Sequence, residues 1–136
     1  MGFDSKVVIA VRDDLADWQK LNVAAFLAGG IAGAAPEAMG EPYIDAAGRP
    51  YAALLGQPMA MMTGDAAALQ RAVSQAHQRA LTVAAFVEGM FATGNDADNR
   101  AVFQQQTAGD SALVGVALRG EGKQVDKATK GLSRHG

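Results

Sequence analysis

The chain has 136 residues, of which 49% are hydrophobic and 19% charged, a balance that excludes a disordered segment and fits one domain of ordinary size. The absence of cysteine excludes disulfides, zinc–thiolate sites, iron–sulfur clusters and thiolate nucleophiles. The net charge is −2, and the N-terminal residues do not resemble a signal peptide, so we expect a single cytoplasmic domain over residues 1–136.

Four apolar runs predict the strands. Residues 7–11, Val-Val-Ile-Ala-Val, form an unbroken and mostly β-branched run, which is typical of a strand buried on both faces of a sheet. Similar runs occur at residues 58–63, 81–87 and 112–118. We therefore predict a sheet of four strands.

Helical patterns lie between or after these runs. The first helix should begin near Asp14 or Asp17, either of which could cap it, and end close to Pro36. Asp65 is the expected N-cap of a second helix, and further helices are expected at residues 97–106 and 125–132. The apolar positions of the first helix recur three and four residues apart, at Trp18, Leu21, Ala24, Ala28 and Ile31.

The alternation of strands and helices predicts the fold class. Strands joined through helices imply right-handed crossovers, and therefore a three-layer α/β/α sandwich around a four-stranded, mostly parallel, mixed sheet. Residues 43–51 are expected to form a small hairpin that turns at Gly48, and Pro42 and Pro50 should keep this hairpin at an edge.

Residues 21–35 carry no charge and contain three glycines, Gly29, Gly30 and Gly33. The run is shorter than the roughly 20 residues of a membrane span, so we expect a buried helix and no membrane association. Each glycine costs about 1 kcal/mol inside a helix, which predicts close packing against the sheet or against a second subunit. On this basis a homodimer is expected.

The C-terminal part of the chain is basic, whereas the rest is acidic. Lys123, Lys127, Lys130 and Arg134 follow one another three or four residues apart, and Gly120 to Lys123 form a turn that could present N–H groups and a lysine to an anion. These residues could contact phosphate or RNA. Alternatively, the turn is a plain connection and the cations complement the negative end of the last helix.

The sequence offers little for metal or nucleophilic chemistry. It has only two histidines, His77 and His135, too few for a multi-histidine metal site or a convincing Ser-His-Asp triad. Asp13 with Asp14, and Asp96 with Asp98, are better interpreted as helix caps because the calcium-loop pattern is missing. We predict no metal and no cofactor.

Two segments carry a family resemblance. Arg12-Asp13-Asp14-Leu15 resembles the Arg-x-Asp-Leu turn that follows the first strand of peptidyl-tRNA hydrolase type II, and residues 113–118 with 125–129 resemble its last strand and final helix. The chain is also similar, including the Asp-Ala-x-Gly hairpin at residues 45–48, to a bacterial family of unknown function with this hydrolase fold. The resemblance implies the hydrolase fold.

The centre of the chain departs from the hydrolase pattern. That family carries Lys, Gln and His on its first helix, where this sequence has Asn22-Val23-Ala24-Ala25-Phe26, and Gly29 stands in the place of the histidine. Its Asp-Ala-Gly turn has no clean counterpart, so the nearest carboxylate is Glu88, and Thr93 could replace its threonine. By this resemblance Glu88 could be the general base, with Lys20, Asn22 and Thr93 as hydrogen-bond donors.

These residues also have purely structural interpretations, with Glu88 a strand-end charge, Asn22 and Thr93 polar caps and Lys20 solvated. We therefore expect a divergent domain that either hydrolyses an aminoacyl or peptidyl ester or binds a small or phosphate-bearing ligand. For the phosphate, Arg12, Lys123 and Lys127 are the candidate contacts. The alternative is a non-catalytic module that works by self-association.

Overall fold

β1 (Ser5–Arg12) is a central strand of the structure, a computed structural model that describes residues 4–106 and 112–135. Its residues 7–11 are buried, as expected of an unbroken β-branched run. β1 pairs with β4 (Met59–Gly64) on one side and with β6 (Leu113–Glu121) on the other. The prediction of a strand at residues 7–11 is therefore confirmed.

The remaining elements follow the predicted chain order closely. The main-sheet strands still to be placed are β5 (Thr82–Val87) and β7 (Ser133–Arg134). The helices are α1 (Asp17–Ala34), α2 (Ala66–Gln78), α3 (Asp96–Gln104) and α4 (Gly122–Ala128), with short 3-10 turns η1 (Pro36–Ala38) and η2 (Glu88–Ala92). Asp65 caps α2 as predicted, because its carboxylate accepts a hydrogen bond from the Ala68 N–H at 2.8 Å.

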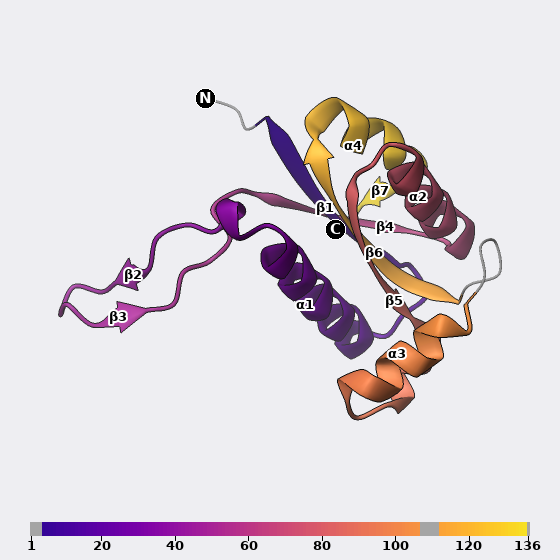
Figure 1. The fold of residues 1–136 in the computed structure, drawn as a ribbon, viewed down its shortest axis with the longest axis horizontal. Helices are drawn as coiled ribbons and strands as arrows, with labels where there is room; N and C mark the ends of the chain where they lie inside the picture. The colour runs from indigo at the N-terminus through magenta and orange to yellow at the C-terminus, as the bar shows by residue number, and fades with distance from the viewer. Residues whose placement is uncertain (1–3, 107–111, 136) are drawn as a thin grey trace.

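Helices cover both faces of the sheet (Figure 1). On one face α1 packs Val23, Leu27 and Ile31 against the β1 residues Ile9 and Val11. On the other face the apolar side of α2, with α4 beside it, packs against β6 and against Ala10 of β1. The expected mixed α/β fold with helices on both sides of a sheet is thus present.

Two details of the predicted sheet are wrong. Within the described residues the sheet has five strands, in the order β5-β6-β1-β4-β7, because the two-residue strand β7 adds to β4. It is mixed, but only the β1–β4 pair is parallel among its described pairings; the others are antiparallel. α3 contacts mainly η2 and does not cross a face of the sheet. The chain therefore re-enters the sheet at the end where β5 finished, and β6 runs antiparallel to β5.

The face that the first helix buries matches the prediction only in part: Ile31 is buried and Ala24 and Ala28 pack against the core, but Trp18 and Leu21 do not. Trp18 and Leu21 are 61% and 72% exposed, while Val23, Leu27 and Ile31 are buried. Neither Asp14 nor Asp17 caps the helix: the N-cap is Ala16, whose N–H donates to the Gln19 side chain at 3.0 Å. Alanine-rich helices give a weak periodic signal, because small residues fit equally well on either side.

The last helix is also shifted. α4 begins at Gly122 and ends at Ala128, so Lys130 and Arg134 lie beyond it and the four predicted cations do not share one helical face. Gly131 has a φ of 95°, a conformation that favours glycine and does not continue a helix.

The small hairpin forms as predicted but stands apart from the main sheet. β2 (Tyr43–Ile44) and β3 (Pro50–Tyr51) pair antiparallel, and Gly48 adopts a φ of 81° in the turn between them. Figure 1 shows this hairpin projecting away from the sheet beyond the C-terminal end of α1. No helix in the described part of the chain is long and apolar enough to cross a membrane.

Candidate functional site

One end of the sheet gathers the elements that form a pocket. β5 is antiparallel to β6, and β6 is antiparallel to β1, so β1, β4 and β5 point in the same direction. Their carboxyl ends therefore lie at one end of the sheet, where η2, α3 and the first turns of α1 come together (Figure 1). Ligand sites of open α/β sheets commonly occur at such an end.

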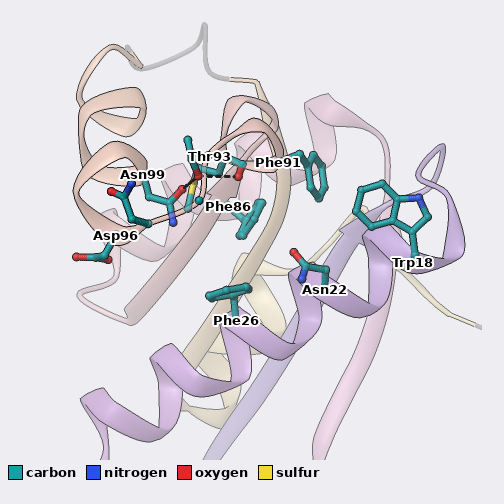
Figure 2. Close-up of a pocket in the computed structure, with 11 residues that line it drawn as sticks. Trp18, Asn22, Phe26, Phe86, Phe91, Thr93, Asp96 and Asn99 are labelled. Carbon is teal, nitrogen blue, oxygen red and sulfur yellow. Dashed lines mark hydrogen bonds between the residues drawn. The ribbon is translucent and has the colours of Figure 1, made fainter.

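The pocket has a volume of about 410 Å³ and lies between α1 on one side and η2 with α3 on the other. This volume is within the range of small-molecule sites, roughly 300–1,000 Å³. α1 contributes Trp18, Asn22 and Phe26, which are four residues apart and so share one helical face. Figure 2 shows their side chains facing those of the η2–α3 region.

A row of aromatic rings forms the apolar wall of the pocket. The ring centroids of Trp18 and Phe91 are 5.7 Å apart, those of Phe91 and Phe86 5.3 Å, and those of Phe86 and Phe26 5.9 Å. The Trp18–Phe91 pair is close to edge-to-face, with an interplanar angle of 67°. Phe86 is buried at the end of β5 and fixes the row to the sheet.

Hydroxyl and amide groups supply the polar part of the pocket lining. The Thr93 hydroxyl donates to the Met90 carbonyl at 2.9 Å and is also hydrogen-bonded to the Asn99 side chain, as the dashed lines in Figure 2 show. Asn95 caps α3 by accepting from the Asp98 N–H at 2.8 Å. Asn22 has no hydrogen-bond partner among the described residues, so its amide is available to a ligand.

The pocket contains little charge. Among its described lining residues the charged side chain is that of Asp96, and Arg100 already pairs with it at 2.7 Å. No lysine, arginine or histidine lines this pocket in the described part of the chain. A phosphate or carboxylate would therefore find no cation there to offset its desolvation.

Arg12 and Glu88 lie close together beside the pocket rather than in its lining. The Arg12 guanidinium is 3.8 Å from the Glu88 carboxylate, donates to Asp14 at 2.6 Å and reaches the Leu113 carbonyl at 3.4 Å. The hydrogen bond from Arg12 holds the pKa of the Asp14 carboxyl below its usual 3.8. Glu88 begins η2, the turn that carries Met90 and Phe91 into the pocket.

The other predicted site residues are dispersed. Lys20 does not line the pocket; its ammonium lies 3.2 Å from the His135 ring. Lys123 and Lys127 belong to α4, which follows Glu121 of β6. Glu121 pairs with Ser5 at the opposite end of β1 from Arg12, so the two lysines are far from Arg12 and the pocket. Phosphate or RNA contact there stays a prediction, separate from this site.

The structure thus brings together Asn22 and Thr93 in one pocket, and Arg12 with Glu88 beside it. Sequence reasoning missed the aromatic row and the amides of α3. The spacing of Trp18, Asn22 and Phe26 was a usable signal, because three residues four apart share one face of a helix. No described group of three or more His, Asp or Glu side chains is placed to hold a metal ion.

Comparison with known proteins places the chain among proteins without an assigned function. Residues 5–135 match the profile of a family described as "Protein of unknown function (DUF2000)". Among solved structures, protein Atu0240 from Agrobacterium tumefaciens strain C58, also of unknown function, is similar with a TM-score of 0.96 and 46% identity; the match covers 99% of this chain and 100% of that one. No curated protein matches the sequence.

Proposed function

We propose that this chain, which belongs to the DUF2000 family of proteins of unknown function, uses the aromatic pocket to bind a small, planar and uncharged ligand. The observation that carries the proposal is the row of four aromatic rings around the free amide of Asn22, which lies between Trp18 and Phe26 on α1. Aromatic walls favour a flat ligand, and a free amide offers one donor and one acceptor position to its edge.

The charge of the lining decides between ligand classes. A ligand with a phosphate or carboxylate would have to give up its hydration without meeting a cation in the described lining. A nitrogen heterocycle or an aromatic amide has a much smaller cost of dehydration on binding, because its polar edge can hydrogen-bond to Asn22 and Asn99. The proposed ligand therefore has a flat apolar face and a neutral donor–acceptor edge.

Binding can be measured through Trp18, because it is the single tryptophan of the sequence and it lines the pocket. Adenine and nicotinamide serve as planar neutral probes, and benzoate serves as a charged probe of similar size. We expect the neutral probes to change the Trp18 fluorescence with saturation, and benzoate to bind at least about tenfold more weakly.

Variants of the lining test the contacts. Asn22→Leu keeps the size of the side chain but removes the amide, and should weaken binding about fivefold to tenfold. Phe91→Ala interrupts the aromatic row and should weaken ligand binding further. Gln78→Leu, which removes an exposed amide on α2, is the matched control and should have no effect. Equal affinity for benzoate and the neutral probes would refute the proposal, as would the absence of any saturable change.

A second proposal is ester hydrolysis with Glu88 as the general base, within a fold related to peptidyl-tRNA hydrolase type II. The position of Glu88 favours it, because this carboxylate begins the turn that lines the pocket and lies near Arg12. The sequence resemblance that motivates the proposed kinship lies largely in β1 and β6, which pair as neighbouring strands.

The hydrolase proposal is tested with an N-blocked aminoacyl-tRNA. Glu88→Gln should abolish hydrolysis, whereas Glu121→Gln, at an exposed glutamate on the opposite end of the sheet from the pocket, should retain it. Thermal unfolding of both variants shows whether they remain folded. If the wild-type protein releases no amino acid above the spontaneous rate, even at high protein concentration, the hydrolase proposal is wrong.

The alternative function, a self-associating module without catalysis, is favoured by the outer face of α1. Leu21 and Phe26 are 72% and 59% exposed on a helix whose residues 21–35 carry no charge. Large exposed apolar surfaces rimmed by polar residues are typical of protein interfaces. Sedimentation of the wild-type protein over a range of concentrations tests this proposal, and a strict monomer would exclude it.

A further inference from the structure

Residues 39–56 form a projecting hairpin, called the arm below. At its base the Gly40 N–H donates to the Leu54 carbonyl at 2.8 Å and the Gly56 N–H to the Ala38 carbonyl at 2.7 Å. A Cβ on Gly56 would lie 3.1 Å from the Ala38 oxygen, so a glycine lets the two chains approach closely there. Figure 1 shows the arm extending away from the rest of the fold.

A carboxylate fixes the tip of the arm. Asp45 accepts hydrogen bonds from the Ala47 and Arg49 N–H groups at 2.9 and 3.0 Å, and also from the Arg49 side chain at 2.8 Å and the Tyr51 hydroxyl at 2.9 Å. These contacts hold the turn in one conformation without help from the rest of the protein. The arm is therefore a preformed element, and little conformational entropy is lost when it docks.

The arm exposes large apolar side chains. Tyr43, Ile44, Tyr51 and Leu54 are 55%, 71%, 52% and 61% exposed. The apolar area of these side chains therefore remains in contact with water in the isolated chain, which is unfavourable. These side chains consequently need an apolar surface supplied from elsewhere.

The outer face of α1 is such a surface. Trp18, Leu21 and Phe26 are exposed there. A Cβ added to Gly29 or Gly33 would have no atom of the described chain within 4 Å, apart from the backbone of its own helix and its chain neighbours. Packing within the chain therefore does not explain these two glycines, although each costs about 1 kcal/mol in a helix. Contact with another surface does explain them.

The connection between the arm and α1 identifies the other surface as a second copy. The arm follows the C-terminal end of α1 directly, after η1, while Trp18 and Leu21 lie near the N-terminal end. In a two-fold dimer whose antiparallel α1 helices meet at their C-terminal ends, each arm runs along the partner's α1 toward the N-terminal end of that helix. An arm of eight residue steps from Met39 to Ala47 reaches about 26 Å, close to the length of α1, about 27 Å.

The exposed area agrees with a stable dimer. The seven apolar side chains of the arm and the α1 face together expose about 850 Å² per copy, taking about 200 Å² for each fully exposed side chain. A standard interface buries about 800 Å² per partner. Because each copy provides one arm and receives one, the arm and the helix face are used equally, as a two-fold interface requires.

We propose that two copies of this chain exchange arms, each laying Tyr43, Ile44, Tyr51 and Leu54 on the outer face of the other's α1. This inference rests on the proposed self-association and specifies its interface. Trp18 and Phe26 belong both to that face and to the pocket, so the arriving arm covers the open side of the partner's pocket. The dimer thus completes the binding site.

The test combines charge substitutions with mixing. Ile44→Lys places a charge on the arm, and Leu21→Glu places the opposite charge on the receiving face; both positions are exposed, so the fold should tolerate them. Sedimentation equilibrium from about 1 to 100 μM should show a wild-type dimer and, for each variant alone, a dissociation constant raised at least about 100-fold. Phe103→Lys, an exposed apolar position on α3, is the control and should remain dimeric.

Mixing the two variants discriminates arm exchange from other dimers. In the mixed dimer one arm–helix contact is fully wild type, and the other brings the introduced lysine of the arm next to the introduced glutamate of the helix face. Because these charges have opposite signs, mixing Ile44→Lys with Leu21→Glu should restore the dimer. A monomeric wild type would overturn both self-association and arm exchange. Arm exchange alone would be overturned if the wild type is a dimer but mixing the two variants does not restore dimerisation. The same conclusion would follow if Phe103→Lys dissociates the dimer as strongly as the two variants do.

Discussion

Replacement of Gly115 by alanine tests the contact that holds α1, and with it one wall of the pocket, against the sheet. Gly115 lies in β6 beneath α1, and a Cβ there would overlap the Val23 Cγ1, lie 3.0 Å from the Leu27 Cδ1 and 3.3 Å from the Ala10 carbonyl oxygen. Val23 is fully buried and β-branched, so it has few alternative rotamers. The helix or the strand must therefore move.

The expected loss of stability follows from two opposing effects. Inserting a methyl group into a close-packed core costs about 1–3 kcal/mol, while replacing glycine by alanine inside a strand recovers about 0.5–1 kcal/mol. We expect Gly115→Ala to lower the free energy of unfolding by about 1–2 kcal/mol, and the Tm by about 4 to 7 °C for a domain of this size.

Urea unfolding, followed by far-ultraviolet circular dichroism, measures this loss. The matched control is Gly120→Ala in the same strand, where the new methyl overlaps only the Cδ2 at the end of the flexible Leu81 side chain, and the change should stay within about 0.5 kcal/mol. In a Val23→Ala background, Gly115→Ala should become less destabilising, with a coupling of at least about 1 kcal/mol. If Gly115→Ala is neutral, or if the coupling is absent, the described packing of α1 on the sheet is wrong.

Two further predictions concern backbone conformation and pH. Ala80, after the end of α2, has a φ of 56°, so Ala80→Gly should stabilise the protein by about 0.5–1 kcal/mol in urea unfolding, whereas Ala67→Gly within α2 should destabilise it by a similar amount. The Arg49 N–H, and next the Tyr51 hydroxyl, hold the pKa of Asp45 below 3.8. Because this pKa is lowered in the folded state, the stabilisation of the arm is present above pH 3.8 and is lost as the pH falls through the lowered value. Proton NMR of the arm should show this loss in the wild type and not in Asp45→Asn, and an arm that melts at the same pH in both would contradict it.

The pocket and the arm are connected through α1. Trp18 and Phe26 serve the pocket on one side and the proposed dimer face on the other, because a helix presents residues four apart along the same stripe. If arms are exchanged, dilution that dissociates the dimer should also lower the affinity for the ligand. By linkage, bound ligand should raise the affinity of dimerisation by the same factor.

Much of the architecture was determined by sequence patterns that act locally. The β-branched run at residues 7–11 can be satisfied only by burial on both faces, and it forms a central strand. Asp65 caps α2, and the turn at Gly48 closes the small hairpin, because these residues act through their immediate neighbours. The same logic placed Asn22 on the first helix and Glu88 at the end of a strand.

Tertiary structure decided what depends on long-range packing. The direction of β6 and the addition of β7 depend on where α3 and the C-terminal residues pack, and no local signal in their sequences specifies that. The exposed face of α1 is set by the close approach of Val23 to Gly115, residues far apart in the sequence, and alanine-rich periodicity did not reveal it. The aromatic pocket joins α1, β5, η2 and α3, so its composition became visible only once the chain had brought these segments together.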